Sequence, residues 1–339
     1  MVYVDPDRAD GVHAGSRGRM GGWMGRKGAC TNDPFMGLIN PSVPMKWPRD
    51  YGLTMRIWLT MGLLLLVYLA FLAVLRSLGI GLGWLILVAV GLGFVQYFFS
   101  DRLVLISTGA RVVERDEYPG LHAMVERLST EAGIPMPRVA IMASPIPNAF
   151  ATGRSPSHAV VAVTDSIQRL LAPRELEAVL AHEIAHVRNR DILTMTIASF
   201  VAMIASLIMN NAIFLSLGDR RDGGNPWMIA WIVAIVVWIV SSLLLSSLSR
   251  YREYAADRGS ALITRDPDAL ISALLKINRR IVEAPRERRR EVEGASAFFI
   301  LPVTASALAE LFATHPPLEK RIEALERCRM EIGQGALFR

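Results

Sequence analysis

Four long runs of uncharged, mostly apolar residues interrupt the chain. They cover residues 57–75, 77–100, 192–218 and 223–249. At 1.5 Å of rise per residue, the first run makes about 29 Å of helix, which matches the hydrocarbon core of a bilayer. A buried core helix is the alternative for any one run, but a soluble domain of this size cannot bury four of them. The pattern therefore predicts a mainly α membrane protein with four transmembrane helices.

The polar segment 101–191 alternates between helical and extended patterns. Apolar residues at helical spacing predict a helix over residues 121–132. β-Branched residues predict extended segments over residues 138–143, 148–152 and 158–164. We therefore expect an α+β domain between the second and third apolar runs.

The positive charges near the ends of the runs predict the orientation. Eight Lys and Arg residues precede the first run, whereas the two outer turns carry only Arg76, Arg220 and Arg221. Both termini are therefore expected in the cytoplasm of a multi-pass plasma-membrane protein. The resulting division is a tail (1–54), a membrane hairpin (55–100), half of a cytoplasmic domain (101–191), a second hairpin (192–249) and the other half of that domain (250–339).

Composition narrows the class of protein further. Hydrophobic residues are 52% of the 339, charged residues are 20% and the mean hydropathy is +0.33, which excludes a disordered chain. Two cysteines, Cys30 and Cys328, exclude a disulfide scaffold. The net charge of +6 suits contact with an anionic lipid bilayer, and no aromatic-interleaved basic domain indicates nucleic acid.

The first fifty residues are polar and glycine-rich, with no early apolar run of the kind that a cleaved signal peptide needs. We expect a disordered basic tail over residues 1–54. Contact of its arginines with lipid headgroups, a solvated tail and an over-extended gene start are three explanations that the sequence leaves open.

The strongest chemical signal lies in the helix that Pro173 begins. This helix contains the sequence HEIAH, in which His182 and His186 lie four residues apart on one face, with Cβ atoms about 6 Å apart. The two imidazoles can bind one cation, and Glu183 lies beside them, close enough to take a proton from a metal-bound water. Two surface histidines are the alternative, but this spacing is rare by chance.

A tetrahedral zinc ion needs a third protein ligand from the same side of the membrane. After two further spans the chain returns at SRYREYAAD, where Glu253 and Asp257 lie four residues apart. One carboxylate can bind the metal while the other accepts a hydrogen bond from a ligating histidine. The spacing does not decide between them, and ion pairs with Arg250, Arg252 or Arg258 are the alternative role for both.

Together with PNAFATG and FATHPPLEKRI, these segments resemble the HtpX-like zinc metalloproteases, integral-membrane gluzincins related to the CaaX prenyl proteases. The resemblance covers roughly residues 55–330. It implies a cytoplasmic zincin-like protease domain with Glu253 as the third zinc ligand and Asp257 as the partner of a ligating histidine. It also implies protein quality control under stress, by degradation of damaged membrane proteins.

Two flanking segments have both a chemical and a structural interpretation. Asn148 and Ala149 lie in an extended stretch that either binds a peptide substrate along a sheet edge or forms an ordinary strand. His315 either donates a hydrogen bond to the developing oxyanion or shapes the turn before two prolines. The basic run 286–290 is either a solvated or lipid-facing loop or a site of self-cleavage.

These residues lead to the hypothesis of peptide-bond hydrolysis by one zinc ion per chain. Zinc held by His182, His186 and Glu253 lowers the pKa of its bound water toward about 7, and Glu183 acts as the general base. The substrates are polypeptides, above all membrane proteins, and the oligomeric state stays open. The alternative is a non-catalytic zinc-binding scaffold or chaperone-like subunit, which has no use for a base beside the first histidine.

Overall fold

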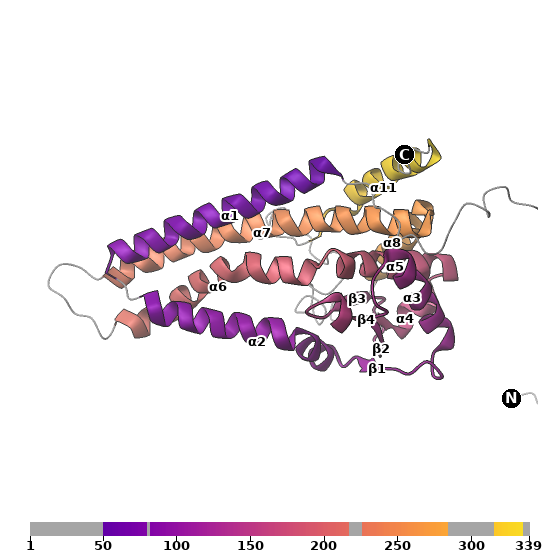
Figure 1. The fold of residues 1–339 in the computed structure, drawn as a ribbon, viewed down its shortest axis with the longest axis horizontal. Coiled ribbons are helices and arrows are strands. Elements are labelled where there is room, and N and C mark those ends of the chain that lie inside the picture. The colour runs from indigo at the N-terminus through magenta and orange to yellow at the C-terminus, as the bar shows by residue number, and fades with distance from the viewer. Residues whose placement is uncertain (1–49, 80–81, 217–225, 284–314, 335–339) are drawn as a thin grey trace, which may run out of the picture. The chain divides into compact units, whose positions relative to one another are not determined.

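The computed structural model describes residues 50–79, 82–216, 226–283 and 315–334 (Figure 1). Most of the predicted tail and the whole of the basic run 286–290 lie outside the described residues. Most of the described residues are helical, and four short strands form one mixed sheet.

Two of the helices are long and apolar enough to cross a membrane, and they pack along each other (Figure 1). Helix α1 covers Tyr51–Ser77 and begins where the side chain of Asp50 accepts a hydrogen bond from the Leu53 N–H, at 2.9 Å. Helix α7 covers Pro226–Thr264 and continues without a break from its apolar part into the polar segment that contains Glu253. The chain is therefore a membrane protein.

The other two apolar runs also form helices, α2 (Leu82–Thr108) and α6 (Asp191–Ser216). Helix α6 packs on α7 and bends by 45° between Asp191–Phe200 and Ala202–Asn210, so it counts as a third span if the bent pair crosses as one. In α2, the apolar stretch Ile86–Phe99 is shorter than a full span. Four membrane spans therefore stay a prediction.

The sheet has the strand order β1-β2-β4-β3. Strands β2 and β4 are parallel and the other two pairs are antiparallel, so β3 lies at an edge. The predicted extended segments are confirmed, except that His158 belongs to a short 3-10 turn begun by Pro156. The strands are β1 (Arg111–Val112), which the sequence did not predict, β2 (Arg138–Met142), β3 (Ala149–Thr152) and β4 (Val160–Thr164).

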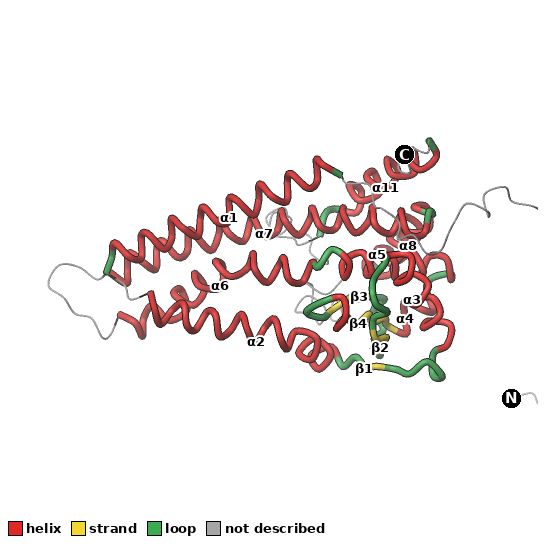
Figure 2. Tube along the Cα trace, viewed as in Figure 1, coloured by secondary structure: helices red, strands yellow, loops and turns green. Residues whose placement is uncertain are grey.

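Helix α5 (Pro173–Arg188) begins at the predicted proline and lies at the centre of the polar part of the molecule. It packs against β3, β4 and α7, and Figure 2 shows the strands in yellow close beside it. Leu180, Ala181 and Ile184 are fully buried, which fixes the helix that carries HEIAH. Four further helices among the described residues belong to this part: α3 (Pro119–Ala132), α4 (Asp165–Leu170), α8 (Pro267–Val282) and α11 (Leu318–Gly333).

Candidate metal centre

Helix α5 presents two imidazoles to one point, as the four-residue spacing predicts. The Nε2 atoms of His182 and His186 lie 3.1 Å apart, and the His182 side chain is only 1% exposed. Two neutral imidazoles gain nothing from facing each other through unprotonated nitrogens unless a cation lies between them. The arrangement therefore fits two ligands of one metal ion.

Glu253 of α7 supplies a carboxylate at the same point. Its Oε1 lies 3.4 Å from His186 Nε2, and its Oε2 lies 3.6 Å from His182 Nε2. Ligand atoms from these three residues lie within 4.8 Å of one another. Because tetrahedral zinc ligands lie about 3.3–3.6 Å apart, the three residues fit a zinc ion and leave a fourth position open.

The distal nitrogen of each histidine faces a buried aspartate. Asp257 Oδ1 lies 2.9 Å from His182 Nδ1, in the position that the resemblance implies. Asp191 Oδ2 lies 2.5 Å from His186 Nδ1, at hydrogen-bond distance. A carboxylate at Nδ1 holds the proton on that nitrogen, so the lone pair of each Nε2 faces the metal position.

Asp191 was not predicted from the sequence, although one signal was available. Asp191 follows His186 by five residues and begins α6. Arg190 between the two helices has a left-handed backbone with φ of 56°, which turns the chain so that Asp191 returns to His186. A carboxylate shortly after HEIAH, at the start of a new helix, was the observation that could have identified it.

Each aspartate is in turn paired with a buried arginine. Arg252 Nε lies 3.0 Å from Asp191 Oδ1. Arg321 of α11 is fully buried and donates to both oxygens of Asp257, at 2.9 Å from Nε and 2.6 Å from Nη2. Arg321 was not predicted from the sequence, because nothing in its local pattern indicates a buried arginine.

Ion pairs with neighbouring arginines were the alternative role for Glu253 and Asp257. For two of those arginines this alternative is wrong. Arg252 binds Asp191, and Arg258 binds Glu331 at 2.7 Å. Glu253 instead faces the two histidines, and Asp257 faces His182 and Arg321.

Glu183 lies between the metal position and the sheet edge. Its side chain is buried, and burial raises the pKa of its carboxyl, against the lowering effect of the two nearby histidines and of the Ala151 N–H, which donates a hydrogen bond to it. Ala151 belongs to β3, which packs on α5. A carboxyl group is thus held between two imidazoles and the edge strand of the described sheet.

The backbone hydrogen bonds of β3 explain why the Ala151 N–H can donate to the Glu183 carboxyl. The Thr164 N–H donates to the Asn148 carbonyl at 3.0 Å, and the Asn148 N–H donates to Thr164 Oγ1 at 2.9 Å. In an antiparallel pair such bonded positions alternate with unbonded ones, so the polar groups of Ala149 and Ala151 point away from β4. Asn148 and Ala149 therefore lie where the outer edge of β3 begins, and both are buried.

His315 also reaches the site. Its Nδ1 lies 3.1 Å from Glu253 Oε2, and its side chain is 11% exposed. Among the residues that the structure describes, its Nε2 has no hydrogen-bond partner. The structure thus brings together all of the predicted site residues, from four separate parts of the chain.

Residues 116–329 of the chain, more than half of its length, match Peptidase family M48. The chain belongs to family M48. It is 50% identical to Protease HtpX homolog 2 of Methanosarcina acetivorans over 290 residues, which are 85% of this chain and 99% of that protein. It is also 50% identical to Protease HtpX homolog of Moorella thermoacetica over 84% of this chain and 96% of that protein. The Pyrococcus furiosus homologue is 43% identical over 82% of this chain and 98% of that protein.

Among solved structures, S. mikatae Ste24p matches 80% of this chain and 67% of its own, with a TM-score of 0.49 and 18% sequence identity. The predicted HtpX-like identity is confirmed by the M48 match and by the close relatives. This M48 protein is therefore a metalloendopeptidase of the membrane, which favours the enzyme over the non-catalytic scaffold.

Proposed function

We propose that this M48 protein is a zinc-dependent endopeptidase that hydrolyses misfolded or damaged membrane proteins at the cytoplasmic face of the membrane. The observation that carries the proposal is the position of Glu183, beside both histidines and in contact with the outer edge of β3 through the Ala151 N–H. A proton acceptor, a cation site and a strand that can pair with a peptide then adjoin one another.

His182, His186 and Glu253 hold the zinc ion in this proposal. Their distances support a set of two nitrogen ligands and one oxygen ligand, and the aspartates behind the histidines support the tautomer that carries its proton on Nδ1 and turns Nε2 toward the metal. A zinc ion there supplies Lewis-acid polarisation of the attacking water and of the scissile carbonyl.

Glu183 and His315 move the proton and stabilise the charge. Glu183 accepts a proton from the attacking water and returns it to the nitrogen of the leaving amine, so the peptide C–N bond breaks without a covalent intermediate. His315 holds Glu253 through Nδ1, and an N–H at its Nε2 donates to the oxyanion that develops on the scissile carbonyl.

The polypeptide substrate pairs with the outer edge of β3. The outward N–H of Ala149 donates a main-chain hydrogen bond to an extended peptide and its C=O accepts one from that peptide, and Asn148 lies at the start of that edge. Main-chain pairing of this kind suits unfolded segments of many sequences, which supports damaged proteins as substrates.

Four membrane spans in two hairpins, with both termini in the cytoplasm, are the topology that accompanies this function. The excess of Lys and Arg before the first span supports the orientation. Helix α7 runs from its apolar part into Glu253 without a break, so a site at its polar end lies close to the membrane surface. Tails and loops of other proteins in the plasma membrane are then within reach.

The test compares the purified, zinc-loaded protein in detergent with the Glu183→Gln variant, and Glu177→Gln on the same helix serves as the control. We expect Glu183→Gln to retain zinc and lose cleavage of an unstructured model protein, with Glu177→Gln close to the wild type. Incubation with a membrane-protein mixture and mass spectrometry of new termini then identifies substrates. Cleavage by Glu183→Gln at the wild-type rate would contradict the role of general base.

A further inference from the structure

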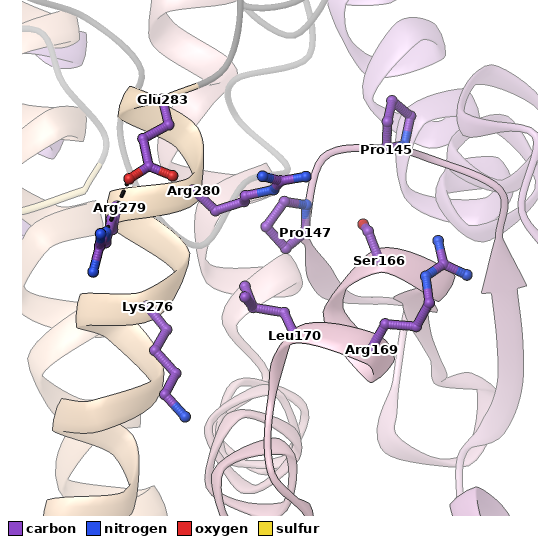
Figure 3. Close-up of a pocket in the computed structure, with 9 residues that line it drawn as sticks. All are labelled: Pro145, Pro147, Ser166, Arg169, Leu170, Lys276, Arg279, Arg280 and Glu283. Atoms are coloured by element: carbon purple, nitrogen blue, oxygen red, sulfur yellow. Dashed lines mark hydrogen bonds and ion pairs between the residues drawn. The ribbon is translucent and has the colours of Figure 1, made fainter.

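A pocket of about 620 Å³ opens beside the start of β3 (Figure 3). One side is the proline-containing loop before β3, and the other sides are α4 and α8. Figure 3 shows Arg280 extending from α8 toward Pro147, and Arg169 on the other side of Ser166. The lining residues are Pro145, Pro147, Ser166, Arg169, Leu170, Lys276, Arg279, Arg280 and Glu283.

The charges of the pocket are unbalanced. Of its four cationic side chains, Lys276 binds Glu175 at 2.8 Å and Arg279 binds Glu283 at 2.9 Å. Arg169 approaches Asp165 only to 3.9 Å, and Arg280 has no acidic partner among the described residues. Among the described residues, most hydrogen-bond donors of the two guanidinium groups that flank the apolar floor have no partner.

The position of the pocket relates it to the proposed substrate edge. Pro147 directly precedes Asn148, and it has no N–H, so main-chain pairing along β3 ends there. Ala151, whose N–H contacts Glu183, lies four residues further along the strand. At about 3.3 Å per residue, the pocket begins roughly 13 Å from the reacting bond.

We infer that this pocket is a specificity subsite that binds an acidic side chain of the polypeptide substrate, about four residues from the bond that is cut. The inference rests on the proposed function, because it requires a substrate paired with β3. Beyond Pro147 the substrate is recognised by a side chain instead of by its main chain. Carboxylates suit the site because planar guanidinium groups bind them through paired hydrogen bonds.

The experiment uses the full-length, zinc-loaded protein in detergent and a peptide that the wild type cuts. Aspartate replaces asparagine at positions three to five residues from the cut, in one series on the N-terminal side and in another on the C-terminal side. On one of the two sides we expect aspartate to raise kcat/KM roughly threefold to fivefold, the size of a half-exposed ion pair.

Variants then connect this preference to the pocket. Arg169→Glu combined with Arg280→Glu should remove the preference for aspartate and replace it with a preference for lysine at the same position. Arg327→Ala, which removes an exposed positive charge on α11, should leave the aspartate preference unchanged. Each comparison is the ratio of kcat/KM for two peptides measured with the same variant. A general loss of activity or stability affects both peptides equally and cancels in this ratio.

The possible failures are distinct. If no peptide is cut, the proposed function fails before the pocket is tested. Equal cleavage of aspartate and asparagine peptides on both sides overturns the subsite. If the peptide ratio is insensitive to the two arginines, the pocket does not select the side chain of the substrate and the inference is wrong.

Discussion

Asp191 Oδ2 lies 2.5 Å from His186 Nδ1, and Arg252 holds the other oxygen of the same carboxylate at 3.0 Å. Asp191 begins α6, whereas Arg252 belongs to α7 and directly precedes Glu253. One buried carboxylate thus joins a histidine of α5 to the helix that carries the third ligand. The relative position of two of the three candidate metal ligands depends on this link.

Replacement of Asp191 by asparagine should weaken zinc binding. The amide keeps the size of the side chain but loses the charge that holds the Nδ1 proton of His186, and such partners typically contribute 10- to 100-fold to metal affinity. The measurement is competition with a chromogenic chelator, which reports zinc affinity independently of cleavage. Asp268→Asn, in an exposed pair with Arg329, is the control. An unchanged zinc affinity in Asp191→Asn would exclude the positioning role.

Arg321→Met should destabilise the protein strongly. The arginine is fully buried and binds both oxygens of Asp257, so its removal leaves a buried carboxylate without its counter-charge. Breaking a buried pair in this way costs about 3–5 kcal/mol. Thermal unfolding in detergent measures the effect, with the exposed Arg327→Ala as the control. Arg321→Lys should recover part of the loss, because the charge returns without the paired hydrogen bonds.

Features of the site that depend on local spacing along the chain could be predicted from the sequence. The convergence of His182 and His186 follows from the period of a helix, and the start of α5 follows from Pro173. The sequence could not separate the roles of Glu253 and Asp257, because residues four apart share one helical face. Only the packing of α7 on α5 decides which of them meets the Nε2 atoms.

The features that were not predicted have different causes, and one of them is a contact between distant segments. Arg321 reaches Asp257 because α11 packs on α7, and the two residues are 64 positions apart. Asp191 depends on one left-handed residue, Arg190, for which the sequence offers no glycine or asparagine signal. Strand β1 has only two residues, which is too short for any periodic pattern.

The stability contributed by Glu175 should depend on pH. Burial opposes ionisation of this carboxyl, but hydrogen bonds from Lys276, Ser272 and the Ala172 N–H outweigh it and lower the pKa of Glu175 below its ordinary value. The folded protein therefore binds fewer protons at this group than the unfolded chain. The stabilisation is complete above the unfolded pKa of about 4.3 and is lost as the pH falls through the lower, folded value.

Glu175→Gln should therefore lower the free energy of unfolding by about 1.5–3 kcal/mol at pH 7, the contribution of hydrogen bonds to a charged group. The difference from the wild type should narrow below about pH 4. Unfolding temperatures across this range measure it, and Glu126→Gln, in an exposed pair with Arg115, is the control. A difference that stays constant with pH would show that the charge of Glu175 contributes nothing.

Gly153 ends β3 in a conformation that only glycine adopts readily, with φ of 126°. A Cβ atom there would lie 2.4 Å from the His158 carbonyl oxygen and 2.8 Å from the Ala159 Cα, both of which are backbone atoms. Gly153→Ala should therefore displace the turn after β3 and destabilise the protein by about 1–3 kcal/mol, as thermal unfolding would measure. Gly120→Ala, at a position with nothing within 4 Å, is the control and should cost nothing.

The displacement caused by Gly153→Ala should also reach the reaction. Gly153 lies two residues after Ala151, whose N–H binds the Glu183 carboxyl, so a shift at the end of β3 moves both the general base and the substrate edge. We therefore expect kcat/KM to fall at temperatures where the variant is still fully folded, with zinc affinity close to that of the wild type. Equal kcat/KM under those conditions would mean that β3 does not position Glu183, and that the strand contributes to stability alone.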